Sequence, residues 1–259
     1  VMHYGVAGAA VATAMGEYVG GLVPLIYFAR KNNSSRLRLV KPVWRKDILL
    51  KTCLNGSSEF MTNASSSVVN MLYNTQLMRL AGADGVAAYG VIMYANFIFA
   101  AIYLGYSMGS APITSYNYGA GNHSELKNML KKSLSLIAVT GVCLTLISEF
   151  FSFLLINIFV GYDADLFAMT LHGFRLYAFV FLINGFNIWA SSFFTALNNG
   201  VVSGMIAFLR TLLFQIGCIM LLPLVLGLNG IWMGVVVAEM LTLIVTIYFL
   251  RSRRKVYHY

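Results

Sequence analysis

The residues best suited to chemistry form a polar stripe around one carboxylate, Glu59, within an otherwise apolar chain. Polar side chains recur there at steps of three and four residues: Asn55, Glu59, Thr62, Asn63, Ser66, Asn70 and Asn74. This spacing predicts one face of a helix. A carboxylate and a ladder of amides at membrane depth need water, a partner helix or a substrate, because an unsatisfied buried polar group is costly. The stripe therefore indicates a polar pathway through a membrane protein.

Glu59 suits the reversible binding of H+ or Na+. A carboxyl group at membrane depth can take up a proton, and surrounding amide and hydroxyl oxygens suit a desolvated sodium ion. Asn55 and Asn63 lie one helical turn away on either side. We expect these three residues to form the ion or proton site, with no cofactor beyond that ion. The alternative is that Glu59 makes only a structural hydrogen bond to a neighbouring helix.

Polar and aromatic residues on other segments are expected to line the same cavity. A second stripe lies between Asn184 and Asn198, and tyrosines near residue 100 suit stacking against a flat organic cation. The expected lining residues are Thr62, Ser66, Asn70, Tyr89, Asn96, Tyr103, Asn184, Asn187 and Ser191. The alternative is that these side chains only join helices, through hydrogen bonds of about 1 kcal/mol each.

Two opposite charges occur half way along adjacent apolar segments, Arg210 and Glu239. Antiparallel neighbours would bring them to a similar depth. We expect an ion pair there, with a structural role rather than one in transport.

The composition predicts an all-α membrane protein. Hydrophobic residues make up 59% of the chain, charged residues 10%, and the mean hydropathy is +0.74. About seven windows have the length and apolar character of a membrane span. They are Tyr4–Ala29, Leu54–Leu80, Val86–Ser110, Ser133–Val160, Leu166–Thr195, Val201–Val225 and Gly230–Leu250. Short connections between the last six predict one antiparallel bundle.

The net charge of +9 is distributed in a way that indicates membrane orientation, not nucleic-acid binding. Of the 18 Lys and Arg residues, eight lie between Arg30 and Lys51, three at positions 127–132 and four at 251–255. Each cluster follows an odd number of predicted spans. The positive-inside rule then places the C-terminus in the cytoplasm and the N-terminus outside the cell membrane. The lipid bilayer is the expected partner of the basic tail.

Sequence signals of catalysis are absent. The chain has no phosphate-binding glycine loop with GKS or GKT, no nucleophile elbow and no HExxH motif. We therefore expect no enzymatic activity, and energy for transport would come from an ion gradient.

The predicted organisation has four parts. Residues 1–30 form one helix, residues 31–51 a basic cytoplasmic connector, residues 52–250 a six-helix unit and residues 251–259 a basic cytoplasmic tail. The chain opens on Val1 with an apolar segment already under way, as though cut from something longer.

Motifs at three separated places resemble the multidrug and toxic compound extrusion (MATE) family. They are GVAGAAVAT (5–13), GVAAYGVI (85–92) with YSMGSAPITSYNYGAGN (106–122), and LGLNGIWMGVVVAEMLT (226–242). Within them Gly109, Pro112 and 116–120 match a glycine, a proline and a YNYGA-like loop, while Gly230, Trp232 and Glu239 match near the end. The matches occur in the right order and cover nearly the whole chain.

The resemblance implies twelve helices in two six-helix lobes with alternating access between them. Residues 1–30 would hold the last helix of an N-terminal lobe, and residues 52–250 would form the C-terminal lobe. The rest of the N-terminal lobe is then an expected, missing partner. The family often carries an ion-binding acid in its seventh helix, where Glu59 falls. A subset carries a second acid in the tenth helix, where this chain has Asn184 and Asn187 instead.

These observations favour a cation-coupled secondary antiporter, driven by H+ or Na+, that exports small organic cations or drugs. One alternative is a lipid-linked oligosaccharide flippase of the same superfold, which would need Arg and Lys in its cavity. Another is a seven-helix receptor, which the number of spans permits.

Overall fold

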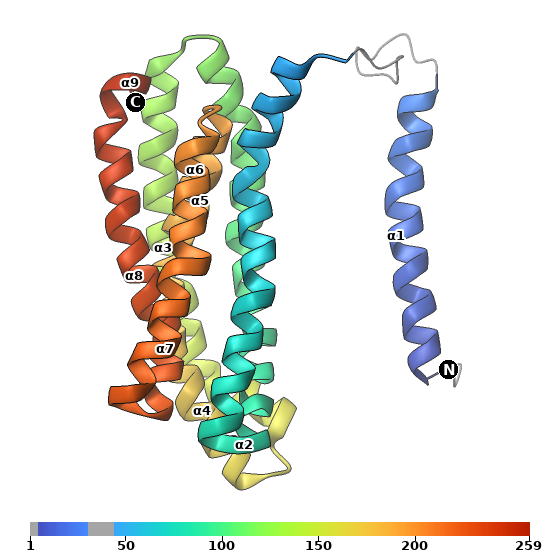
Figure 1. The fold of residues 1–259 in the computed structure, drawn as a ribbon, viewed down its shortest axis with the longest axis vertical. Coiled ribbons are helices and arrows are strands. Elements are labelled where there is room, and N and C mark those ends of the chain that lie inside the picture. The colour runs from blue at the N-terminus through green and yellow to red at the C-terminus, as the bar shows by residue number, and fades with distance from the viewer. Residues whose placement is uncertain (1–4, 31–43) are drawn as a thin grey trace. The chain divides into compact units, whose positions relative to one another are not determined.

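The computed structural model describes residues 5–30 and 44–259, and the regular structure in these ranges is helical (Figure 1). The chain divides into two units, Val1–Asp47 and Ile48–Tyr259. The first contains the single helix α1 (Gly5–Ala29). Most of the predicted basic connector, residues 31–43, lies outside the described residues.

Almost all of α2 (Lys46–Gly119), a long helix that folds back on itself, lies in the second unit. Its backbone leaves helical geometry at Gly82, where φ is 64° and ψ is −151°. Residues on either side of this bend meet, because the rings of Tyr73 and Tyr89 stack with centroids 4.8 Å apart. The bend therefore separates a first arm (residues 46–81) from an antiparallel second arm (residues 83–119).

The far ends of the two arms also lie at the same level. Asn55 Nδ2 donates to the Thr195 carbonyl at 3.3 Å, and Ser115 Oγ donates to the neighbouring Ala196 carbonyl at 2.9 Å. Each arm therefore runs most of the length of the bundle (Figure 1). The sequence predicted two spans with a connection at residues 81–85. In the structure a single residue, Gly82, leaves helical geometry and makes that connection.

The remaining helices follow with short connections. They are α3 (His123–Val160), α4 (Ala164–Ala178), the 3-10 helix η1 (Phe179–Leu182), α5 (Asn184–Ala196), α6 (Gly200–Phe208), the π-helix η2 (Leu209–Phe214), α7 (Gln215–Leu226), α8 (Leu228–Ser252) and α9 (Arg254–Tyr257). Side chains cap three of their starts: Asn122 accepts from Glu125 N, Asp163 accepts from Asp165 N and Leu166 N, and Asn199 accepts from Val202 N. Such caps satisfy amides that a helix cannot pair internally.

Six helical stretches in the described residues are long and apolar enough to cross a membrane. The stretch in α2 spans 61 residues, or about 90 Å of helix, roughly three times the thickness of a bilayer core. Because it bends back at Gly82, it supplies two crossings, and the six stretches give seven. The prediction of an all-α membrane protein is confirmed.

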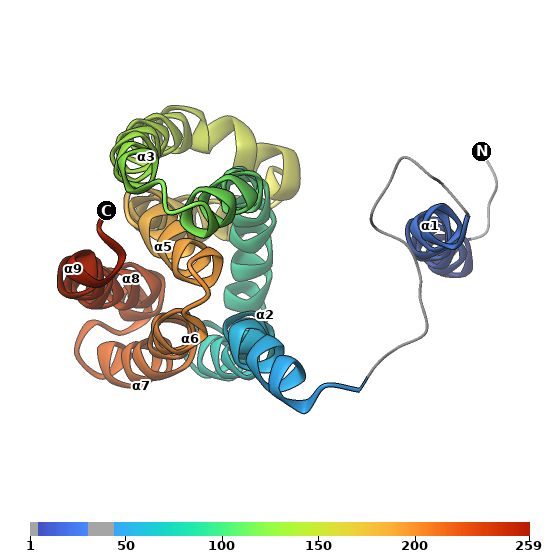
Figure 2. The ribbon, with the colours of Figure 1, turned by 90° about the horizontal axis from the view of Figure 1, so that it is seen from above.

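The core of the second unit surrounds α5. Seen along the bundle, α5 lies between α2, α3, α6 and α8 (Figure 2). Its Trp189 and Phe193 are buried with Trp232 of α8, and many outward-facing Leu, Ile, Phe and Val side chains are exposed. One close approach joins α6 to α2, since a Cβ on Gly200 would meet the Leu54 carbonyl oxygen at 2.3 Å.

The bend in α2 predicts a strict requirement for glycine at position 82. Its backbone conformation is almost confined to glycine, so Gly82→Ala should destabilise the protein by about 1–3 kcal/mol. The measurement is the midpoint of thermal unfolding in detergent.

Gly90→Ala is the matched control, because Gly90 is helical and a Cβ there would meet nothing within 4 Å. This variant should be neutral or slightly stabilised. Equal destabilisation of both variants would contradict the assignment of the bend to Gly82.

Candidate functional site

The predicted polar stripe lies on an exposed face of the first arm of α2. Glu59, Asn63, Ser66, Asn70 and Asn74 are all exposed. Several of their polar groups bond back to their own helix: Asn63 Nδ2 to the Glu59 carbonyl at 2.9 Å, and Asn74 Nδ2 to the Asn70 carbonyl at 2.9 Å. Ser66 Oγ likewise donates to the Thr62 carbonyl at 2.7 Å. The amide donors of Asn63 and Asn74 are thus used locally, and the carboxylate of Glu59 stays exposed.

Asn55 presents a buried acceptor one helical turn before Glu59. Its Nδ2 donates to the Thr195 carbonyl, whereas its Oδ1 is buried and accepts no hydrogen bond from the described residues. Asn55 and Glu59 are four residues apart on one helix face, where side chains are neighbours. A buried oxygen of this kind suits a cation or a water molecule.

Further along the same arm the stripe meets the second arm and a surface depression. Tyr89, which is buried, donates from its hydroxyl to Asn70 Oδ1 at 3.0 Å. The depression has a volume of about 670 Å³ and is lined by Met71, Asn74, Thr75, Met78 and Arg79. Asn96 of the second arm is half-buried.

Tyr103 lies in the packed core, although it was expected to line a cavity. Its hydroxyl donates to the Phe181 carbonyl at 2.7 Å, and its ring packs where a Cβ on Gly185 would sit. Phe181 belongs to η1, a 3-10 helix, and bonds to side chains satisfy carbonyls that such irregular turns leave unpaired. The physical reason for the position of Tyr103 is therefore this acceptor together with the space beside Gly185.

The second predicted stripe is buried at its start and exposed at its end, at Asn198. Asn184 and Asn187 are 3% and 0% exposed, and Ser191 Oγ donates to the Ser203 carbonyl of α6 at 3.3 Å. Asn184 Oδ1 is buried and has no hydrogen-bond partner among the described residues. In this structure the polar side chains of α5 bond to three neighbouring helices: Asn187 to α8, Ser191 to α6 and Ser192 to the Ser107 carbonyl of α2.

Asn187 joins a buried network centred on Glu239. Its Nδ2 donates to Glu239 Oε2 at 2.7 Å, and its Oδ1 accepts from Thr246 Oγ1 at 2.9 Å. Arg210 Nε donates to Glu239 Oε1 at 2.8 Å, with side chains 17% and 3% exposed. The structure thus brings together Arg210 and Glu239, as expected from the sequence, and adds Asn187 and Thr246.

Thr246 was missed by the sequence reasoning, although a signal was present. Glu239, Thr242 and Thr246 are spaced by three and four residues, which is one helix face of α8. Arg210 lies in η2, a π-helix. One extra residue per turn shifts the direction of the following side chains, and such π-turns are frequent at functional sites.

Comparisons with known proteins place this arrangement in one family. The MatE family model matches residues 60–220, well over half of the chain. The multidrug export protein MepA of Staphylococcus saprophyticus is 26% identical over 254 residues, covering 96% of this chain and 55% of that protein. The chain thus spans about half the length of this relative.

Solved structures agree on the fold. A crystal structure of MATE in complex with MaL6 superposes with a TM-score of 0.88 at 20% identity, covering 99% of this chain and 58% of that one. An outward-facing conformation of a multidrug resistance MATE family transporter of the MOP superfamily gives a TM-score of 0.85 at 22% identity, covering 99% and 58%. The resemblance found in the sequence motifs is confirmed.

The buried network predicts strong coupling between Arg210 and Glu239. Arg210→Met alone should destabilise the protein by about 3–5 kcal/mol, because it leaves a buried carboxylate without its counter-ion. Arg210→Met combined with Glu239→Leu should recover a large part of this loss. The measurement is a double-mutant cycle on unfolding in detergent.

Lys132→Met is the control for removing a cation from an exposed helical position and should change stability little. Additive effects of the two network substitutions would contradict the coupling.

Proposed function

This chain belongs to the MatE family, and we propose that it forms part of a cation-coupled secondary antiporter that exports small organic cations or drugs by alternating access. It is a multi-pass membrane chain of a transporter family, not an enzyme. The match to a protein named for multidrug export, along 96% of this chain, supports the proposed activity.

We further propose a division of the chain within that transporter. Residues 1–30 would be the last helix of an N-terminal lobe, 31–51 a cytoplasmic connector, 52–250 the six-helix C-terminal lobe and 251–259 a cytoplasmic tail. The separation of the structure into units at Asp47 and Ile48 supports this division. The remainder of the N-terminal lobe would be the structural partner. The distribution of Lys and Arg supports an outer N-terminus and a cytoplasmic C-terminus.

The observation that carries the proposal is the exposed polar face around Glu59. A carboxylate in a helix long and apolar enough to span a membrane is expensive against lipid, so this face needs a hydrated cavity. In a two-lobe transporter that cavity would lie between the lobes, with Glu59 on its wall. The cavity lining would come from Thr62, Ser66, Asn70, Asn96 and neighbouring side chains of α2.

The proposed coupling step is binding of H+ or Na+ at Glu59, with Asn55 and Asn63 beside it. The buried Oδ1 of Asn55, which accepts no hydrogen bond from the described residues, supports an additional oxygen ligand for Na+. A proton would need only the carboxylate. Either ion would neutralise Glu59 and so change the relative stability of the two access states.

The charge of this face favours organic cations over the flippase alternative. The stripe from Asn55 to Asn74 contains one acid and no Lys or Arg, whereas a pyrophosphate-linked substrate requires basic side chains. The basic residue Arg210 is bonded to Glu239. Membership of a transporter family argues against the seven-helix receptor alternative.

Replacing Glu59 tests the proposed coupling. Glu59→Gln in the full-length protein should abolish ion-driven efflux of a cationic dye such as ethidium, because an amide keeps the size of the side chain and cannot bind a proton or balance Na+. The measurement is dye efflux from proteoliposomes under an imposed pH gradient or an imposed Na+ gradient. The gradient that drives the unsubstituted protein identifies the ion.

Glu125→Gln is the matched control, since Glu125 is an exposed acid in the first turn of α3, outside the stripe. It should retain full efflux. Retained coupling in Glu59→Gln, with normal folding, would remove Glu59 from the mechanism.

A further inference from the structure

A groove is lined by residues of α3, α8 and the C-terminal tail. The start of α3 and the end of α8 lie at the end of the bundle that holds the C-terminus (Figure 1). The volume of the groove is about 410 Å³. The lining combines basic and apolar side chains: Lys127, Leu130, Lys131, Leu134, Ile247, Leu250, Arg251, Arg254 and Tyr259. The groove is separate from the polar face around Glu59, and the proposed transport mechanism does not use it.

Four cations converge on this groove from two helices and the tail. Lys127, Lys131 and Arg251 form no ion pair with any carboxylate in the described residues. Arg254 Nε donates to the main-chain oxygen of Tyr259 at 3.1 Å. The nearest acid in sequence, Glu125, accepts instead from Asn128 Nδ2 at 3.2 Å. The groove therefore presents a concentrated positive charge.

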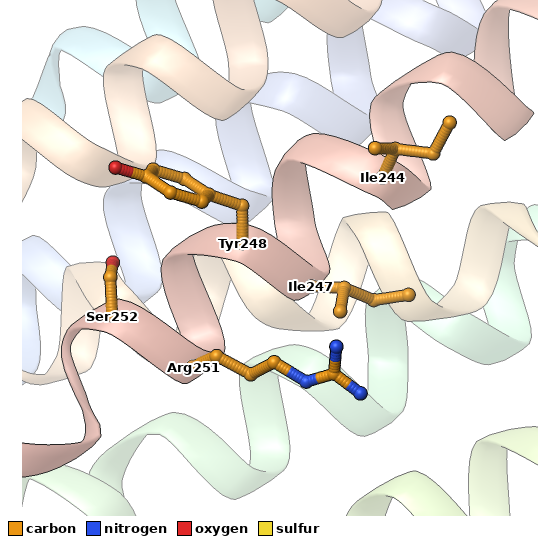
Figure 3. A pocket seen from close by; sticks show the side chains of 5 residues that line it. All are labelled: Ile244, Ile247, Tyr248, Arg251 and Ser252. Carbon is orange, nitrogen blue, oxygen red and sulfur yellow. The ribbon is translucent and has the colours of Figure 1, made fainter.

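Apolar side chains continue from the cations toward the membrane-spanning part of α8. Figure 3 shows Ile247 and Arg251 on one side of the helix, with Tyr248 and Ser252 on another. One turn further on, Ile244 is 66% exposed. An anion bound at Arg251 would thus lie next to an apolar surface formed by Ile247 and Ile244, which we call the apolar track.

Tyr259 of the C-terminal tail also lines the groove and is held in place by tertiary contacts. Tyr259 is 2% exposed, its ring packs against Phe193 of α5 with centroids 5.3 Å apart, and its hydroxyl donates to the Leu250 carbonyl at 3.2 Å. Burial raises the pKa of the Tyr259 phenol, which keeps this donor protonated. The Tyr259 side of the groove is therefore a wall fixed by tertiary contacts. This distinguishes the groove from a loose cluster of surface lysines.

We propose that this groove binds one anionic phospholipid, with the phosphate between Lys127, Lys131, Arg251 and Arg254. An acyl chain would lie along Leu130, Leu134 and Ile247. Basic pockets between transmembrane helices suit anionic headgroups, and Arg and Lys together offer several charge-assisted hydrogen bonds to phosphate oxygens. The apolar track distinguishes a lipid from a free phosphate ion, which would gain nothing from it.

Lipid binding can be tested on the purified full-length protein. Native mass spectrometry in detergent would be used to titrate phosphatidylglycerol, phosphatidylcholine with the same acyl chains, and inorganic phosphate. The unsubstituted protein should retain one phosphatidylglycerol in preference to phosphatidylcholine. In the double variant Lys131→Gln with Arg251→Gln, phosphatidylglycerol should bind about thirtyfold more weakly.

The matched control is Lys132→Gln with Arg253→Gln. It removes the same two charges from the same two helix ends, but neither residue lines the groove. Its affinity for phosphatidylglycerol should stay close to that of the unsubstituted protein. Unfolding temperatures without added lipid would establish that both double variants are folded. Phosphatidylglycerol should raise the unfolding temperature of the unsubstituted protein and of the control, and should raise that of Lys131→Gln with Arg251→Gln much less.

Other outcomes would overturn the proposal. Equal losses in the two double variants would mean diffuse attraction to a basic surface. Equal retention of phosphatidylcholine would mean binding through the acyl chains alone. Displacement of phosphatidylglycerol by millimolar phosphate would identify a phosphate site. None of these outcomes bears on Glu59, so the proposed transport function would stand or fall separately.

Discussion

The buried carboxylate of Glu239 is the constraint around which the second unit is organised. A carboxylate that is 3% exposed within a membrane bundle needs a counter-ion and donors for its oxygens. Arg210 from η2 supplies the charge, and Asn187 from α5 supplies a donor at 2.7 Å. Three separate helical segments, α5, η2 and α8, are thereby fixed relative to one another. In the low dielectric of the bundle, losing one partner leaves the others unsatisfied, so the network acts as a unit.

The two polar stripes of the sequence have opposite positions because their surroundings differ. The stripe on α5 lies at the centre of the bundle, so Asn187 and Ser191 find partners on α8 and α6. The stripe on the first arm of α2 lies at the edge, and Glu59 remains exposed. The same residue types therefore stabilise the bundle in one place and leave a hydrophilic face in the other. Burial, not composition, separates the structural stripe from the candidate transport site.

Local signals in the sequence were sufficient to predict the helices, but not to predict which residues they contact in the folded chain. Hydropathy together with the helical stripe located the spans, and the steps of three and four residues around Glu59 correctly placed Asn63, Ser66 and Asn70 on one helical face. No local pattern indicates that α2 would continue through residues 81–85 with a single bend, because this depends on the packing of Tyr73 on Tyr89. The burial of Tyr103 likewise depends on the Phe181 carbonyl, 78 residues away. Contacts between residues far apart in sequence form only in the folded chain, so local sequence patterns do not predict them.

The basic end of the bundle is tied together by aromatic contacts, and this bears on two separate inferences. Tyr257 bonds to Asn199 Nδ2 through its hydroxyl at 2.8 Å, and its ring lies 5.6 Å from that of Tyr118. The α2–α3 and α5–α6 connections therefore meet the tail at one end, where the Lys and Arg residues of α3, α8 and α9 also gather. Under the positive-inside rule, the proposed orientation depends on the number of basic residues at this end, whereas the proposed lipid binding depends on the spacing of particular cations. Moving one cation to a neighbouring position on the same helix end would keep the number of basic residues and so the proposed orientation. It would change their spacing and so weaken the proposed lipid binding. The proposed orientation and the proposed lipid binding would therefore rest on one set of residues but depend on different features of it.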